Sequence, residues 1–311
     1  MIGSNETRTY RFVWGDARGR MVEWTREGEV FSPGSPGDPD SVRASRPWVL
    51  EERDGTLRMW YSGHDGTTGR IMEAVQPVGS PWEHVGVAVD PGLVGESDGY
   101  GVESPCVVRV PGGYLMAYGG SDGEHTRVHM AISADGHRWT GHGTIMQRGE
   151  EDALAATHPC LLITGERWWL FYSGYDGTNE GRRGAVLAAV SDSGASWDRI
   201  GPVLDPQAEE LAASHPCVLE VCRKLYMFYA SDDGEHVGIA LASSAEGAGW
   251  QRRGGVLSPA DDGHDDLAVH TPCAVRLRNG ELRLWYAARP VGDTELCYRI
   301  CAASFPGIWP A

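Results

Sequence analysis

The chain has 311 residues, of which 41% are hydrophobic, with 42 Gly, 12 Trp, seven Cys and a formal net charge of −16. This composition indicates a globular protein, and such an acidic chain without a basic stripe excludes nucleic acid and anionic membranes as expected partners. Without a run of about 18 apolar residues to span a membrane or a signal-peptide pattern at the start, we expect a cytoplasmic protein with reduced cysteines.

The first expected element in chain order is the segment at residues 19–33, GRMVEWTREGEVFSP, which carries a Trp but follows no strand that could pair with it. Five similar units then follow, each marked by a proline and by an aromatic pair that ends in Tyr, and a Trp recurs with the same spacing from Trp24 onward. The prolines are Pro47, Pro105, Pro159, Pro216 and Pro272. The tyrosines are Tyr61, Tyr118, Tyr172, Tyr229 and Tyr286, and the tryptophans are Trp24, Trp82, Trp139, Trp197 and Trp250. Three markers that share one period indicate a repeat architecture.

Each unit contains four short apolar runs separated by turn residues. In the fourth unit these runs are CVLEV at 217–221, LYMFY at 225–229, VGIALAS at 237–243 and WQRRGGVLSP at 250–259. Four strands in about 55 residues predict one propeller blade. The fifth unit ends near residue 305 without its Trp-containing strand, which residues 19–33 could supply. We therefore predict an all-β fold: a single domain over 1–311, a five-bladed β-propeller of four-stranded antiparallel blades, closed by the N-terminal segment.

The cysteines of the HPC-like motifs occupy the same repeat position, which favours small buried side chains over metal or redox chemistry. Acidic residues also recur in every unit. Before the proline stand Asp40, Asp98, Asp152, Glu209 and Asp265, and after the Tyr stand Asp65, Asp122, Asp176 and Asp233. A feature that every unit repeats is most simply a device of the fold, such as an Asx turn or a cap.

Positions that differ between the units point to function. Just before the prolines the units carry Arg46, Glu103, His158, His215 and His270. Strand alternation places the turn after each aromatic pair on the same face, and that turn adds His64, Asp122, Tyr175, Asp232 and Arg289, while Tyr100 precedes the second inner strand. Together they form a polar ring suited to a small polar ligand.

The repeated pattern PCVL…YMFYAS.DG…IALA.S..G..W.R.G.VL.P resembles the five-bladed propeller glycosidase superfamily, with glycoside hydrolase family 43, the invertases and the levansucrases, over residues 10–305. The resemblance implies a carbohydrate-active enzyme, and the motif ESP gives Glu103 the role of general acid. That family carries an Asp where this chain has Arg46, so the base would be Asp98 or Asp40, or Asp152 in their place. The sugar hydroxyls would be bound by Tyr100, Asp122, Tyr175 and Asp232.

Two alternatives remain open. The first is a lyase, isomerase or cyclase in which His158, His215 and His270 act as acid and base, or bind one divalent ion, calcium or a transition metal. The second is a sugar-binding module, which would be expected to repeat its sites from blade to blade. Arg46 and Arg289 could also clamp a carboxylate or phosphate of the ligand, or pair with nearby Asp side chains.

Overall fold

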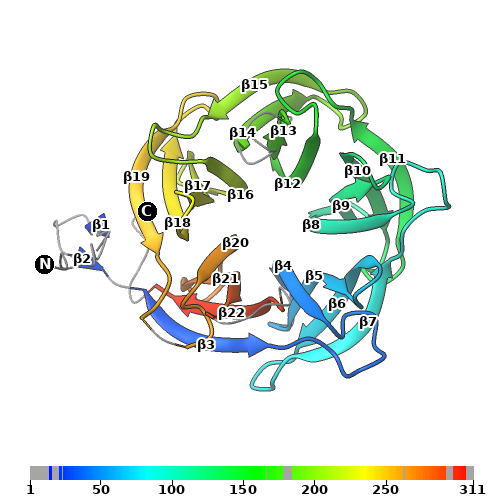
Figure 1. Ribbon diagram of the computed structural model, residues 1–311, viewed down its shortest axis with the longest axis horizontal. Helices are drawn as coiled ribbons and strands as arrows, with labels where there is room; N and C mark the ends of the chain where they lie inside the picture. The colour runs from blue at the N-terminus through cyan, green and yellow to red at the C-terminus, as the bar shows by residue number, and fades with distance from the viewer. Residues whose placement is uncertain are drawn as a thin grey trace, which may run out of the picture.

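The strands of the computed structural model lie in antiparallel sets arranged around a central axis (Figure 1). The structure describes residues 14–15, 21–22, 24–165, 167–177, 184–261, 263–291 and 297–305. These residues form strands, turns and bends without a helix, so the described chain also holds no helix that could cross a membrane. The fold is therefore all-β and of the propeller type, as predicted.

Consecutive strands pair in the order of the sequence. The first set is β4 (Arg43–Glu51), β5 (Leu57–His64), β6 (Gly69–Gln76) and β7 (Glu83–Val89). The second is β8 (Gly101–Val110), β9 (Gly113–Ser121), β10 (Thr126–Ser133) and β11 (Thr140–Met146). The third is β12 (Ala155–Thr164), β13 (Arg167–Tyr175), β14 (Gly184–Ser191) and β15 (Asp198–Leu204). The fourth is β16 (Ala212–Val221), β17 (Lys224–Asp232), β18 (Val237–Ser244) and β19 (Gln251–Leu257).

The last set combines the two ends of the chain. It consists of β20 (Ala268–Arg276), β21 (Leu282–Arg289), β22 (Arg299–Ser304) and, on the outside, β3 (Thr25–Phe31). β3 and β22 are antiparallel, with Phe31 opposite Ile300 and Thr25 opposite Ser304. β3 is therefore the outermost strand of this set, and its pairing covers an edge of β22 that would otherwise be open. Before it, β1 (Trp14–Gly15) and β2 (Met21–Val22) form a small separate pair.

The innermost strand of each set, nearest the axis in Figure 1, contains a bulge at its proline. The residue directly before each proline adopts a left-handed backbone with φ between 49° and 56°. These residues are Arg46, Ser104, His158, His215 and Thr271. A side chain other than Gly is strained there, so the fold must hold it in place, and such strain concentrates at functional sites. In two sets a serine of the preceding set accepts the freed N–H: Ser62 Oγ from Ser104 at 2.8 Å, and Ser173 Oγ from His215 at 2.8 Å.

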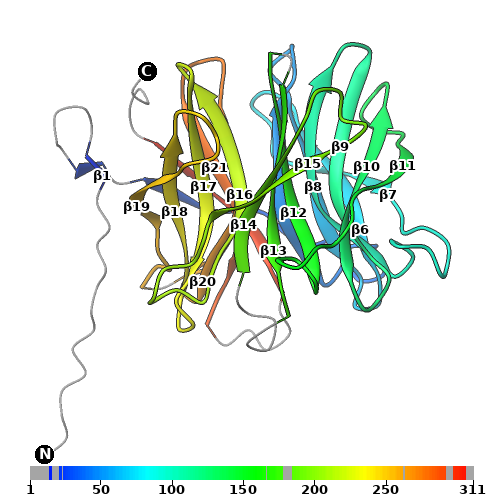
Figure 2. The ribbon, with the colours of Figure 1, turned by 90° about the horizontal axis from the view of Figure 1, so that it is seen from above.

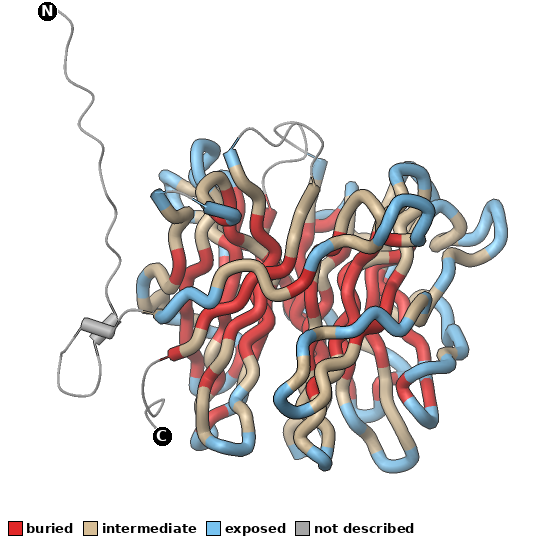
Figure 3. Tube along the Cα trace, turned by 90° about the horizontal axis from the view of Figure 1, so that it is seen from below, coloured by how far each residue is buried: buried red, intermediate tan, exposed pale blue. Residues whose placement is uncertain are grey.

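The core lies between neighbouring sets, and Figure 3 shows buried residues along the strands and exposed residues at the turns. Trp48 packs against all five hydrophobic clusters, which places its indole at the centre of the molecule. Its Nε1–H donates to the Val107 carbonyl of the next set at 2.8 Å.

The cysteines that occupy the position of Trp48 in the other sets also form hydrogen bonds to the next set. The Sγ of Cys106 accepts the N–H of Leu161 at 3.0 Å, and Cys217 accepts that of Ala274 at 3.3 Å. All four cysteines at this position are buried and free, and burial raises the pKa of the Cys106 thiol well above its usual value. The prediction that these thiols are structural is confirmed.

The recurring carboxylates bind the tyrosines of the aromatic pairs. Tyr61 Oη donates to Asp40 at 2.7 Å and Tyr286 Oη donates to Asp265 at 2.8 Å. In the third set Arg199 joins Asp152 to Tyr172, with both hydrogen bonds at 2.9 Å. For the fourth set the sequence predicted Glu209 in this role, and that prediction is wrong by one residue.

The residue that takes this role is Glu210, whose carboxylate pairs with Arg252 at 2.9 Å, while Glu209 is exposed. The acidic turn residues are also structural: Asp65 and Asp233 accept the backbone N–H groups that follow them. A side chain that binds its own turn is the Asx device expected from sequence.

Candidate functional site

Five of the predicted side chains come together at one end of the inner strands. They are Arg46 on β4, Glu103 on β8, His158 on β12, His215 on β16 and His270 on β20, and are called the bulge cluster below. Each lies at the bulge of its strand, but at one of two positions. Arg46, His158 and His215 directly precede the proline, in the left-handed conformation, whereas Glu103 and His270 stand one residue earlier. The sequence treated these positions as equivalent, because it could not show where the backbone bulges.

Glu103 joins side chains from three consecutive sets. One carboxylate oxygen pairs with Arg46, and the other accepts a hydrogen bond from Thr157 Oγ1 at 3.3 Å. The side chain of Glu103 is 29% exposed and that of Arg46 is 22% exposed, while Thr157 is buried. The carboxylate is thus held firmly on one side and open to a ligand on the other, as catalytic or binding groups must be.

The three histidines form a continuous row of rings. The ring centres of His158 and His215 lie 3.8 Å apart, edge to face, and those of His215 and His270 lie 5.8 Å apart. His270 continues the row against Tyr298, 4.7 Å away and nearly perpendicular. Ser214 Oγ is hydrogen-bonded to His215 Nδ1 at 2.9 Å. The imidazoles therefore lie in mutual contact, as the acid–base alternative required.

These imidazoles are neutral at physiological pH. Burial lowers the pKa of His158 and His215 well below the usual value, with the charge of Arg46 acting in the same direction. Burial and then Arg46, Arg289 and Arg43 lower the pKa of His270 to about 3. A neutral imidazole has one donor and one acceptor nitrogen, so each ring could give or take a proton in a reaction.

Tyr175 is the predicted site residue of the third set that lies at the end of its second strand. It is the last residue of β13 and lies opposite Ala155, the first residue of β12. Burial raises the pKa of its hydroxyl, which a hydrogen bond with Ser214 opposes, and the charges of Arg46 and Glu103 also act on it. Equivalent strand ends carry His64, Asp232 and Arg289, each opposite the first residue of an inner strand. The sequence prediction that these strand ends and the bulges share one face is confirmed.

Sequence reasoning missed Arg43. It begins β4, at the position where the other inner strands begin with Gly101, Ala155, Ala212 and Ala268. Burial lowers its pKa and the charge of Arg46 adds to this effect, while Glu103 acts against it. The signal was present in the repeat: a long cation replaces a residue that is Gly or Ala in every other unit.

The remaining candidates are engaged elsewhere. His84 lies 3.3 Å from Asp40, and although burial opposes the negative charge, hydrogen bonds from His84 and Tyr61 hold the pKa of Asp40 below its usual value. Asp98 accepts a hydrogen bond from Tyr118 at 3.1 Å. Asp40 therefore contacts the second and outer strands of its own set, and Asp98 contacts the second strand of its set. Their role as the catalytic base stays a prediction.

Four of the side chains predicted to bind the ligand have other contacts or lie in solvent. Asp122 accepts two backbone N–H groups and pairs with Arg127 at 2.7 Å, and Asp232 accepts the N–H of Gly234 at 2.8 Å. His64 accepts the N–H of Gly66 on Nδ1 at 2.9 Å. Tyr100 is 66% exposed. These four groups stabilise turns or lie in solvent, and their contact with a ligand stays a prediction.

A metal at the histidines is a weaker interpretation of this geometry. Among the residues that the structure describes, no group of three or more His, Cys, Asp or Glu side chains is arranged to hold a metal ion. The neighbouring charges of Arg46, Arg43 and Arg289 would also repel a cation from His270.

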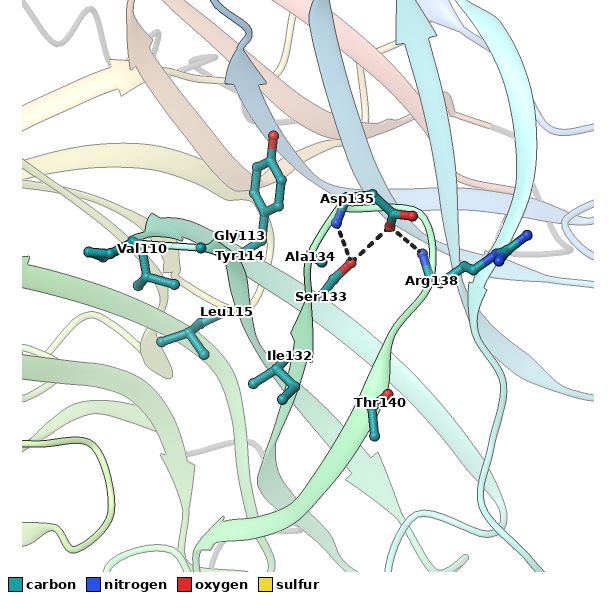
Figure 4. Close-up of a pocket in the computed structure, with 12 residues that line it drawn as sticks. Val110, Gly113, Tyr114, Leu115, Ile132, Ser133, Ala134, Asp135, Arg138 and Thr140 are labelled. Carbon is teal, nitrogen blue, oxygen red and sulfur yellow. Dashed lines mark hydrogen bonds between the residues drawn. The ribbon is translucent and has the colours of Figure 1, made fainter.

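A hollow of about 570 Å³ lies away from the bulge cluster, and Figure 4 shows side chains that line it. It is formed where β9 begins and β10 ends, between residues such as Val110, Tyr114, Ile132 and Arg138. The bulge lies at the opposite end of β8 from Val110. Ser133 and Asp135 in its wall bind each other and their own turn, so the hollow offers few free polar groups.

Solved structures similar to this chain are glycoside hydrolases of propeller-type families. One, described as a glycoside hydrolase, has a TM-score of 0.75 at 16% identity and covers 92% of this chain and 96% of its own. A thermostable family-43 glycoside hydrolase has a TM-score of 0.68 at 17% identity, over 86% and 95% of the two chains. A third is reported for the GH130 family of mannoside phosphorylases, which contains glycoside hydrolases that target β-1,2 mannosidic linkages in Candida mannan. Its TM-score is 0.74 at 16% identity, over 93% and 95%.

At this level of identity the likeness shows a shared fold. No protein-family model matches the chain. A curated sequence from Mycobacterium tuberculosis (strain CDC 1551 / Oshkosh), the uncharacterized protein MT1551, is 31% identical over an alignment of 235 residues that covers 68% of this chain and 75% of that protein. The chain belongs to the same protein family as MT1551.

Proposed function

We propose that this protein is a carbohydrate-active enzyme, related in fold to the glycoside hydrolases, with its active site at the bulge cluster. The five sets are the blades of one domain over residues 1–311, closed into a ring by β3. The inner strands then surround the axis, and their bulges form the mouth of the central channel, with Trp48 across its interior. Propellers commonly present chemistry at such a mouth, because several strands can each contribute a side chain to it.

The observation that carries this proposal is the position of Glu103. Its carboxyl group is partly exposed, fixed by Arg46 and Thr157, and belongs to a cluster whose side chains differ between the units. In glycoside cleavage a carboxylic acid protonates the departing oxygen while a second group on the other side assists the anomeric carbon. Glu103 is in position for the first of these roles, which it takes when its ion pair with Arg46 opens and the carboxyl group carries a proton.

The group that takes the second role differs from that of the resembled family. Arg46 occupies the place where the resembled family carries its Asp, and Asp40 and Asp98 are bound to the tyrosines of their own sets. Tyr175 lies within electrostatic reach of both Arg46 and Glu103, and His270 lies within reach of Arg46. Either a carboxylate is released from its tyrosine when substrate binds, or one of these neutral groups assists instead.

The test is the substitution Glu103→Gln, assayed on a panel of glycosides. Loss of general acid catalysis should reduce turnover by about 10²–10⁴-fold without lowering the melting temperature greatly. Glu124→Gln is a matched control, because the Glu124 side chain is 86% exposed on a turn. Since Glu103→Gln also removes an ion pair, Glu103→Asp provides a second variant that keeps the charge but shortens its reach. Turnover retained in both variants would exclude Glu103 as the acid.

A second candidate is a non-hydrolytic reaction, such as elimination or isomerisation, for which the row of three neutral imidazoles is the specific observation. Neutral imidazoles are suited to move protons to and from carbon and oxygen without a second carboxylate. Reaction in water labelled with ¹⁸O separates the two candidates. Hydrolysis incorporates the label into the product, whereas elimination creates a double bond without it.

A further inference from the structure

The bulge cluster contains buried polar atoms that lack partners. Both ring nitrogens of His158 and both of His270 are buried and have no hydrogen-bond partner among the described residues. The Nε of Arg43 is in the same situation. Leaving such groups unpaired destabilises the folded protein, and native proteins rarely tolerate it without a ligand or water at the site. Five such atoms from three different strands indicate that something polar belongs between them.

The charges around these atoms decide which kind of group it is. The charges of Arg43 and Arg46 both act on His270, and that of Arg46 acts on all three histidines, so both guanidinium groups lie within electrostatic reach of the rings. Glu103 pairs with Arg46 and leaves the charge of Arg43 uncompensated by a direct ion pair among the described residues. A local excess of positive charge in a protein of net charge −16 favours an anion and opposes a metal ion.

The donors also fit an oxyanion in their geometry. A guanidinium binds a carboxylate or a phosphate through two parallel N–H groups, which neutral hydroxyls cannot match in strength. The imidazoles add single N–H donors from β12, across the axis from β4, and from β20, in the set beside β4. Donors that approach from several directions suit an acid group with two or more oxygens.

We propose that Arg43, with Arg46, His158 and His270, binds the acid group of an anionic sugar, either a carboxylate or a phosphate. The acid-group site stands on the unpaired atoms and charges alone, whereas the sugar that carries the group rests on the proposed function. Binding leaves Glu103 beside the ligand and orients the sugar relative to it.

The experiment measures binding by calorimetry to the purified full-length protein. The probes are glucuronate, glucose 6-phosphate, inorganic phosphate and, as the neutral reference, glucose, all at equal ionic strength. We expect at least one of the two sugar acids to bind more tightly than glucose, and the tighter one identifies the acid group. Binding of inorganic phosphate alone supports the acid-group site and counts against the sugar, so the two parts of the proposal fail separately.

The variant Arg43→Ala should weaken this binding about tenfold or more, because one charged hydrogen-bonding partner is lost. Arg276→Ala is the matched control: it removes the same charge from an exposed position at the far end of β20 and should change binding little. If Arg43→Ala does not fold, Arg43→Lys keeps the charge without the planar fork, and the thermal shift of the unaltered protein by each anion needs no variant. Failure of every anion to bind, equal binding of glucose, or unchanged affinity in Arg43→Ala overturns the proposal.

Discussion

The low pKa of His270 predicts that acid destabilises the fold long before the carboxylates are protonated. A histidine whose pKa is 6.5 when unfolded and about 3 when folded binds its proton more readily in the unfolded chain. Its contribution to stability is therefore complete above pH 6.5 and is lost as the pH falls from there toward 3. Each pH unit in this window costs about 1.4 kcal/mol, so lowering the pH from 6.5 to 5 should cost about 2 kcal/mol through His270 alone.

The assay is urea unfolding at pH 7.5 and at pH 5 for three proteins. The unaltered chain should lose about 2 kcal/mol more than His270→Gln between these conditions, because the variant has no imidazole to protonate at this position. His142→Gln, at an exposed position, should behave like the unaltered chain. The charges that face His270 are those of Arg43, Arg46 and Arg289, so salt should reduce the effect.

The same prediction can be checked without a variant. In a proton NMR titration of the folded protein, the His270 ring should show no midpoint between pH 7.5 and pH 5. A midpoint near 6.5, or an equal loss of stability in His270→Gln and the unaltered chain, would refute the buried, neutral state assigned to this ring.

Three further outcomes follow from the packing. Trp48→Ala should lower the free energy of unfolding by about 3–5 kcal/mol, measured with urea, because the indole contacts every core cluster; a loss below 1 kcal/mol would contradict its central position. Tyr286→Phe should cost about 1 kcal/mol by removing the hydrogen bond to Asp265, whereas Tyr100→Phe at an exposed site should cost less than half of that. A thiol reagent should modify exposed Cys222 in the folded protein, and react only after unfolding with the buried Cys106, Cys160, Cys217 and Cys273; rapid reaction of all of them would show that the inner strands open readily.

Much of the candidate site was predictable because the units repeat. A residue that recurs, such as the carboxylate before each proline, indicates a role in every unit, and the structure shows that role as a bond to Tyr61 or Tyr286. A residue that breaks the pattern indicates a role in one unit, which singled out Glu103. Arg43 broke the pattern equally clearly, but its position is otherwise Gly or Ala and drew no attention as a polar site.

What the sequence could not provide were contacts between units. The ion pair of Arg46 with Glu103 joins residues 57 positions apart, and the hydrogen bond of Thr157 to Glu103 joins residues 54 apart. Such contacts depend on how the sets twist around the axis, which no local pattern encodes. The sequence also could not show whether Glu209 or its neighbour takes the structural role, because a loop of fixed length can present either of two neighbouring carboxylates.

By itself, the sequence predicted the order of the strands, their turns, the burial of the cysteines and the pairing of a segment within residues 19–33 with the last set, because periodicity and turn chemistry are local. The tertiary structure decided which side chains meet. The left-handed bulge before each proline turns Arg46, His158 and His215 out of the regular alternation of a strand and toward their neighbours from other sets. Burial in that shared space then makes the imidazoles neutral, a property that belongs to the assembled site and to no single unit.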